Sequence, residues 1–164
     1  MIITIDGVAG AGKTTLASHM SDEYVGRFSV QIIHMDDLYD GWDDPLGPAL
    51  SQKLHAIVEA HQAGLPYETT KYDWLKSAPG EALMIPPVDL LIIEGVGAGS
   101  RATQESAISK IWIDLEPMVG LRRVLARDGF EIEEHMLTFL EQQRIHHMQE
   151  DTRAVADFHL NGLN

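Results

Sequence analysis

The sequence predicts an α/β domain in which a parallel sheet of about five strands is covered by helices on both faces. Short apolar runs recur at 1–5, 29–34, 89–94 and 110–115, and segments with helical periodicity lie between them. Strands that alternate with helices form parallel sheets, because each helix carries the chain back to the start of the next strand. The 164 residues contain no internal repeat and no linker-like stretch, so we expect residues 1–164 to form one domain.

Periodicity predicts the helices. In segment 13–26, Leu16, Met20 and Tyr24 are spaced to share one helical face. Gly64 ends a second helical segment, as glycine often does. The remaining expected elements are helices over 48–63, 117–127 and 132–156 and a last short strand over 158–160.

Two segments are predicted to lack regular structure. The stretch 36–47 is acidic and contains glycine and proline, which is typical of a loop. The stretch 68–87 is interrupted by Pro79-Gly80 and by Pro86-Pro87, so we expect it to be irregular.

Composition excludes several function classes. The net charge is −13, with 25 acidic and 12 basic residues, which argues against nucleic acid and anionic membranes as partners. The chain has no cysteine, which excludes disulfides, cysteine metal sites and thiol nucleophiles. No apolar run approaches the ~20 residues that span a bilayer. The N-terminus lacks the basic start of a signal peptide, so we expect a cytoplasmic protein.

A phosphate-binding motif follows the first strand. Gly7-Val-Ala-Gly-Ala-Gly-Lys13-Thr14 matches the G-x-x-x-x-G-K-[ST] pattern in full, with an apolar strand before it and a helix after it. Glycines let backbone N–H groups approach a phosphate, Lys13 reaches the β- and γ-phosphates, and the Thr14 hydroxyl is a ligand for Mg²⁺. The motif predicts a P-loop NTPase fold that binds ATP and Mg²⁺. The residues expected to hold the nucleotide are Gly7, Ala9, Gly10, Ala11, Gly12, Lys13, Thr14 and Thr15.

Carboxylates follow two of the other predicted strands, at the edge of the sheet where ligands bind. Asp36 stands where a phosphate acceptor needs a base, although Asp36 and Asp37 also suit ordinary turn-capping positions. Glu94 ends an apolar run before a glycine-rich segment, so we expect it to help Thr14 hold Mg²⁺.

These pieces together resemble the uridine kinase group of P-loop kinases, which includes nicotinamide riboside kinase and phosphoribulokinase. The resemblance rests on 7–14, Asp36-Asp-Leu-Tyr39, Tyr72-Asp-Trp74 and Glu94-Gly95, and it covers roughly residues 1–160. It implies a nucleoside or nucleotide kinase-like fold with a short lid, and transfer of the γ-phosphate of ATP to a nucleoside 5′-hydroxyl.

The resemblance also implies roles for single residues. Asp36 corresponds to the general base and Tyr39 to an aromatic residue at the sugar, while Tyr72 and Trp74 correspond to rings that flank the base. The helix 121–128 resembles the one that leads into the lid, and Arg123 and Arg127 are its candidate catalytic arginines together with Lys13 of the loop. Two features depart from the family pattern. The segment after Asp128 is acidic, and Leu75-Lys76-Ser77 stands where a base-reading histidine is common.

Several residues allow two interpretations. Tyr72 and Trp74 suit a ligand platform or a hydrophobic core, and Trp42 suits a substrate contact or a loop anchor. His146 and His147 have no third metal ligand at a suitable spacing, and their helix face is expected to be solvated. Arg153 either stacks on adenine or pairs with Asp157.

The function has rivals as well. A regulatory ATPase or a nucleotide-binding protein that no longer transfers phosphate would carry the same loop. Nicotinamide riboside or another vitamin or sugar alcohol is an alternative acceptor. We expect a small-molecule substrate, and the sequence leaves the oligomeric state open, a homodimer included.

Overall fold

A central sheet of five parallel strands organises the chain in the computed structural model, which describes residues 1–162. The strand order is β2-β5-β1-β6-β7. The strands are β1 (Ile2–Gly7), β2 (Val30–His34), β5 (Leu90–Glu94), β6 (Ser109–Asp114) and β7 (Phe158–Asn161). Because β1, β5 and β2 pair in parallel, their carboxyl ends lie at the same end of the sheet. The predicted fold class is confirmed.

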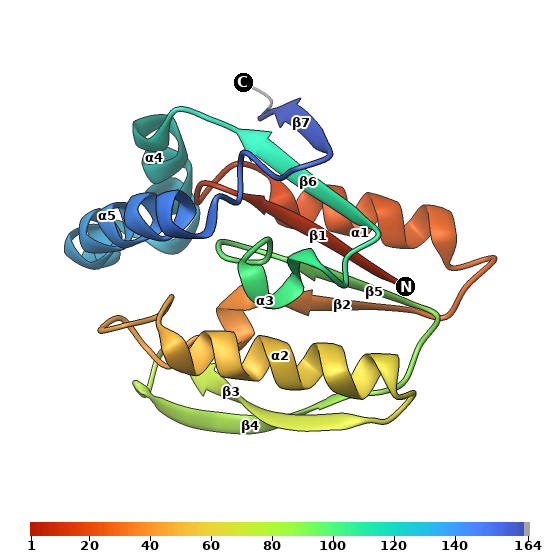
Figure 1. Cartoon of the computed structure of the whole chain (residues 1–164). Coiled ribbons are helices and arrows are strands. Elements are labelled where there is room, and N and C mark those ends of the chain that lie inside the picture. The colour runs from red at the N-terminus through yellow and green to blue at the C-terminus, as the bar shows by residue number, and fades with distance from the viewer. Residues whose placement is uncertain (163–164) are drawn as a thin grey trace.

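Helices cover both faces of the sheet (Figure 1). On one face α1 (Lys13–Tyr24) packs Ala17 against a cluster that includes Ile5 and Ile92. On the other face lie α2 (Pro48–Gln62) and the short α3 (Arg101–Gln104). Neighbouring residues of β5 point to opposite faces, so Ile92 joins the first cluster and Ile93 joins the second. This strand is buried throughout, which explains its unbroken apolar sequence.

Two helices lie at the end of the sheet to which the strands point (Figure 1). They are α4 (Pro117–Asp128) and α5 (Glu133–Glu150), joined by Gly129 and the single turn η2 (Phe130–Ile132). The connection stands where the short lid was expected. Within the described residues, no helix is both long and apolar enough to cross a membrane.

The stretch 68–87 is not irregular, and this expectation was wrong. It forms most of an antiparallel hairpin of β3 (Tyr67–Asp73) and β4 (Ala78–Ile85), with a bulge between Thr70 and Tyr72. The hairpin is a two-stranded sheet of its own, so each strand has a free edge that tolerates proline.

The last helix is shorter than predicted. α5 ends at Glu150 and not at 156, because Asp151 adopts a left-handed conformation with φ of 55°. The chain then turns back to form β7 at the sheet edge, as the short apolar stretch 158–160 predicted.

Candidate active site

The turn between β1 and α1 depends on three glycines. Gly7, Gly10 and Gly12 have φ angles of 142°, 76° and 93°, a region that other residues rarely adopt. Gly12 is the N-cap of α1, and no side chain caps this helix. The first N–H groups of α1 therefore have no intrahelical partner, which makes the helix start suited to bind an anion.

Lys13 crosses this loop. Its Nζ donates hydrogen bonds to the carbonyl oxygens of Gly7 at 3.0 Å and Val8 at 2.8 Å. Burial lowers the pKa of Lys13, while the charges of Asp6, Glu94 and Asp36 act in the opposite direction without offsetting it. The ammonium group is thus close enough to these three carboxylates to interact with them.

The other predicted loop residues have distinct positions. The amide of Ala11 donates to the carbonyl of Val8 at 3.2 Å and closes the turn. Ala9 is buried and its amide donates to a side chain of α5, whereas Thr15 is exposed in the first turn of α1. The first half of the loop is therefore held by hydrogen bonds to the protein, and the second half leads into the uncapped start of α1.

Thr14 and Glu94 meet at the edge of the loop. The Thr14 hydroxyl donates to Oε1 of Glu94 at 2.9 Å, and Glu94 is only 4% exposed. A hydroxyl and a carboxylate oxygen are ligands that suit Mg²⁺, so the pair fits the predicted metal. Among the described residues, no group of three or more His, Cys, Asp or Glu could hold a metal ion. Mg²⁺ would therefore take its other ligands from phosphate oxygens and water.

His34 is a site residue that the sequence analysis missed. Its Nδ1 lies within hydrogen-bond distance of Oε1 of Glu94, and this contact raises the pKa of His34. His34 is the last residue of β2 and pairs in register with Glu94 on β5. That pairing between neighbouring strands could not be inferred without knowing the strand order.

Asp36 lies directly after β2, in the turn η1 (Met35–Asp37). The residue is solvent-exposed, yet the surrounding protein desolvates its carboxyl enough to raise its pKa. The charge of Glu94 raises the pKa further, while Lys13 and Arg127 lower it. Asp37 is 3.3 Å from Nζ of Lys71 instead. Asp36 is therefore the aspartate of the two that shares the charge environment of the loop.

The two predicted arginines lie on α4 beside the loop. Arg123 donates from Nη1 to the carbonyl of Gly10 at 3.3 Å. Arg127 forms two hydrogen bonds of 2.6 Å to Asp128, and the charges of Asp36 and Glu94 also contribute to its raised pKa. Arg123 thus contacts the loop directly, whereas Arg127 pairs with its neighbour Asp128.

Two glycines bring α4 against the loop. A Cβ atom on Gly120 would lie 2.1 Å from the carbonyl oxygen of Ala9, and one on Gly10 would lie 2.4 Å from the carbonyl oxygen of Gly120. Neither distance is possible for real atoms, so the approach of helix and loop depends on both glycines.

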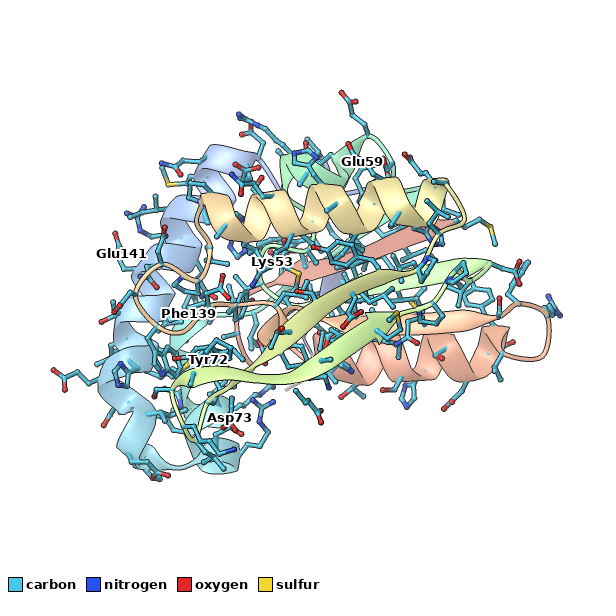
Figure 2. The ribbon with its side chains drawn as sticks, turned by 90° about the horizontal axis from the view of Figure 1, so that it is seen from below. Lys53, Glu59, Tyr72, Asp73, Phe139 and Glu141 are labelled. Atoms are coloured by element: carbon cyan, nitrogen blue, oxygen red, sulfur yellow. The ribbon has the colours of Figure 1, made fainter. Side chains whose placement is uncertain are left out.

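Aromatic side chains form a cluster next to Asp36, which we call the aromatic wall. Its members are Tyr39, Trp42, Tyr72, Trp74, His135 and Phe139. Trp74 is central, with ring centroids 4.9 Å from Tyr72 and 4.8 Å from Trp42, and its Nε1 donates to the carbonyl of Asp36 at 3.2 Å. Figure 2 labels Tyr72 on the hairpin and Phe139 on α5, and the ring centroid of Trp42 lies 6.4 Å from that of Phe139. The wall thus joins the hairpin, the acidic loop and α5.

Tyr39 departs from its expected position at the sugar. It is 3% exposed, and its hydroxyl donates to the carbonyl of Val96 at 2.7 Å. Its ring supports Trp74 from inside the wall. His135 and Phe139 were not predicted, although their spacing of four residues on a helix would place them on one face.

The expectation of a solvated face on α5 was wrong, and so was one of the two interpretations of Arg153, its pairing with Asp157. The helix face with His147 is not solvated, because Gln143 is 2% exposed and the His147 side chain is 10% exposed. Arg153 pairs with Asp114 through contacts of 2.8 and 3.1 Å, and Asp157 pairs with Lys110 instead. Strand β7 brings these partners together, which sequence spacing could not show.

Comparison with known proteins gives kinases of nucleosides and nucleotides as relatives. No protein-family model matches the chain. A cytidylate kinase of Methanococcoides burtonii is 26% identical over 143 residues, covering 87% of this chain and 72% of that protein. A uridine kinase of Lactobacillus helveticus is 25% identical over an alignment that covers 78% of this chain and 67% of that protein. A solved structure of a possible uridine kinase from Bacillus stearothermophilus has a TM-score of 0.69 and 17% identity, covering 98% of this chain and 88% of that chain.

These similarities agree with the geometry of the loop. The fold is shared with solved kinase structures whose sequences differ widely from this one. The chain therefore has the P-loop kinase fold and resembles the uridine kinase-like group of P-loop kinases in both sequence and structure.

Proposed function

We propose that this protein transfers the γ-phosphate of ATP to a hydroxyl group of a small molecule, with a nucleoside 5′-hydroxyl as the first candidate. The observation that carries this proposal is the geometry of the loop, where Lys13 crosses the turn and Thr14 meets Glu94, with Asp36 directly after the neighbouring strand β2. A carboxylate, a lysine and a hydroxyl–carboxylate pair at the carboxyl ends of neighbouring strands support phosphoryl transfer, which needs a base, a phosphate-binding cation and a metal site.

Each residue has a role in this reaction. The N–H groups at the start of α1 and Lys13 hold the phosphates, and Mg²⁺ held by Thr14 and Glu94 would neutralise phosphate charge. Asp36 accepts the proton of the acceptor hydroxyl while the oxygen of that hydroxyl bonds to the γ-phosphorus. The bond from that phosphorus to the bridging oxygen breaks, and ADP leaves. A raised pKa makes Asp36 a stronger base than an ordinary aspartate.

The charges near Asp36 favour a hydroxyl acceptor over a phosphate acceptor. Three lysines of this part of the described chain are each within 4 Å of an aspartate: Lys53 of Asp40, Lys71 of Asp37 and Lys76 of Asp73. The phosphate of an acceptor such as cytidylate would lie near these aspartates and be repelled by them, because the neighbouring lysines already pair with carboxylates. Uridine and cytidine carry no such charge.

The aromatic wall supports a planar group on the acceptor. Tyr72, Trp42 and Trp74 are partly exposed, so their rings can pack against a base. Nicotinamide riboside, which also has a planar ring, and another vitamin or sugar alcohol are the alternative acceptors. The net charge of −13 supports a free small molecule and not a nucleic acid or membrane, and a cytoplasmic location accords with this.

A panel of acceptors tests the proposal directly. The purified protein is incubated with Mg²⁺ and ATP plus uridine, cytidine, nicotinamide riboside or cytidylate, and each acceptor is examined by mass spectrometry for one added phosphoryl group. We expect a nucleoside to gain the group and cytidylate to remain unchanged. Phosphorylated cytidylate would instead favour a nucleotide kinase, as the name of the Methanococcoides burtonii relative suggests. ADP release without any modified acceptor would identify an ATPase and refute the proposal.

A further inference from the structure

Helix α5 contacts the buried side of the phosphate loop through Gln143. Oε1 of Gln143 accepts a hydrogen bond of 3.1 Å from the amide of Ala9, in the middle of the loop. Gln143 is 2% exposed and 134 residues away from Ala9 in the sequence. A buried glutamine needs a polar partner, and here the partner is the loop backbone itself.

A second contact lies one turn further along α5. His147 Nε2 is 3.3 Å from Oδ1 of Asp6, the buried residue that precedes the loop. The His147 ring packs edge-on against Trp112, with centroids 4.7 Å apart, which fixes its direction. α5 therefore approaches both the entrance and the middle of the loop.

Asp6 connects this helix to two loops. Its Oδ1 accepts hydrogen bonds from the amides of Gly7 at 2.7 Å and Gly97 at 3.1 Å. Its Oδ2 accepts from the amide of Gly99 at 2.9 Å. Asp6 is 2% exposed, so the carboxylate is stable there because these donors and His147 surround it. The entrance to the phosphate loop and the glycine-rich loop after Glu94 share this one anchor.

These contacts determine which way the loop peptides face. The amides of Gly7 and Ala9 donate to Asp6 and Gln143, so neither N–H is left for a bound phosphate. If the Ala9 amide lost its acceptor, a buried N–H would be unsatisfied, and rotation of that peptide would become favourable. A rotated peptide would present a different group to a bound phosphate.

We propose that Gln143 and the Asp6–His147 pair are positioning residues that hold the phosphate loop in its nucleotide-binding conformation. None of them needs to touch the nucleotide. The proposal rests on the proposed function for the statement that the loop binds ATP, but the loop conformation can be measured without any acceptor. It also explains why a polar side chain occupies a core position that leucine or methionine could fill.

Gln142 provides a matched control on the same helix. It is the same residue type and adjacent in sequence, but its Nε2 donates to the carbonyl of Asp43 at 3.0 Å, outside the phosphate loop. Gln142→Leu and Gln143→Leu therefore remove the same side chain group from two different surroundings. Gln143→Glu keeps an acceptor oxygen at the original position.

The experiment combines two measurements on the full chain: amide hydrogen exchange at Ala9 by NMR, and binding of ATP with Mg²⁺ by calorimetry. We expect Gln143→Leu to accelerate exchange at Ala9 and to weaken ATP binding about tenfold, the effect of one lost buried hydrogen bond. Gln142→Leu should change neither quantity, and Gln143→Glu should recover most of the affinity. Equal exchange and equal affinity in the two leucine variants would overturn the proposal for Gln143.

His147→Phe tests the second anchor and remains informative if Gln143→Leu does not fold. The phenyl ring can still pack on Trp112 but cannot contact Asp6. We expect faster exchange at Gly7 and weaker ATP binding. Unchanged exchange and affinity would exclude the pair as an anchor. If the wild-type chain binds ATP but modifies no acceptor, the proposed function fails while both anchors remain tested by the binding data.

Discussion

The hydroxyl of Thr14 donates a hydrogen bond of 2.9 Å to the carboxylate of Glu94, and so joins the first turn of α1 to the end of β5. The two residues are 80 positions apart in the sequence. In the proposed reaction these two oxygens would hold Mg²⁺, which would offset the charge of the phosphates.

Substitution of either residue should raise the Mg²⁺ requirement. We expect Thr14→Val and Glu94→Gln each to shift the Mg²⁺ concentration for half-maximal activity upward by about tenfold, because one oxygen ligand or its charge is lost. Titration of activity with Mg²⁺ measures the shift, and EDTA should abolish activity in every variant. Ser18→Ala, one turn further along α1, is the control. An unchanged titration curve for Thr14→Val would remove it from the metal site.

Asp36→Asn and Asp37→Asn form a matched pair. We expect Asp36→Asn to lower kcat by ~10²-fold or more with ATP affinity unchanged, because an amide cannot accept the hydroxyl proton. Asp37→Asn should retain activity, since Asp37 pairs with Lys71 and not with the loop. Steady-state kinetics with saturating ATP distinguishes the two. Activity near the wild-type level in Asp36→Asn would show that another group takes the proton.

The aromatic wall should affect the acceptor and not ATP. Replacing Trp74 with Ala removes the ring that contacts both Tyr72 and Trp42, so we expect the KM of the acceptor to rise by about tenfold with the KM of ATP unchanged. Tyr24→Leu alters an aromatic side chain on the opposite face of the sheet and serves as the control. A rise in the KM of ATP alone would show that the wall lies at the nucleotide.

Gly120 tests the approach of α4 to the loop. A Cβ atom in Gly120→Ala would lie 2.1 Å from the Ala9 carbonyl oxygen, so helix and loop must separate. We expect weaker ATP binding and a loss of about 1–3 kcal/mol in the free energy of unfolding, as for overpacked cores. Gly26→Ala is the control, because no atom lies within 4 Å of its added Cβ. Chemical denaturation and calorimetry give the two quantities, and equal values for both variants would contradict the close approach.

Asp6 should make the free energy of unfolding decrease at acid pH. Burial alone would raise its pKa, but the nearby imidazole of His147 and the amides of Gly99 and Gly7 outweigh burial and lower it from 3.8. A lowered folded-state pKa contributes stability above the unfolded value, and this stability is lost as the pH falls through the folded value. We therefore expect the free energy of unfolding of the wild type to fall more steeply below about pH 4 than that of Asp6→Asn.

Urea denaturation at a series of pH values checks this difference. Asp6→Asn should be less stable than the wild type at neutral pH, and the two curves should converge in acid. Asp22→Asn, at an exposed position of α1, should follow the wild type. Parallel curves for Asp6→Asn and the wild type would show that Asp6 has the same pKa in the folded and unfolded chain.

The sequence was most informative where the structure is local. The strand, glycine turn and helix of residues 1–24 were predicted because apolar periodicity and the loop motif are contained within one short segment. The hairpin of β3 and β4 was missed because proline and glycine are breakers inside a sheet but not at the free edges of two paired strands. The expected role of Tyr39 depended on which face of a loop would be buried, and packing against Trp74 decided it.

By itself, the sequence determined the α/β fold, the phosphate loop and the two carboxylates at strand ends, because each depends on residue types at fixed short spacings. Only the tertiary structure decided that Glu94 meets both Thr14 and His34, that Arg153 pairs with Asp114, and that Gln143 holds the Ala9 amide. These contacts join segments far apart in the chain. Their formation depends on strand order and on which helix face is buried, and both result from the packing of the whole domain.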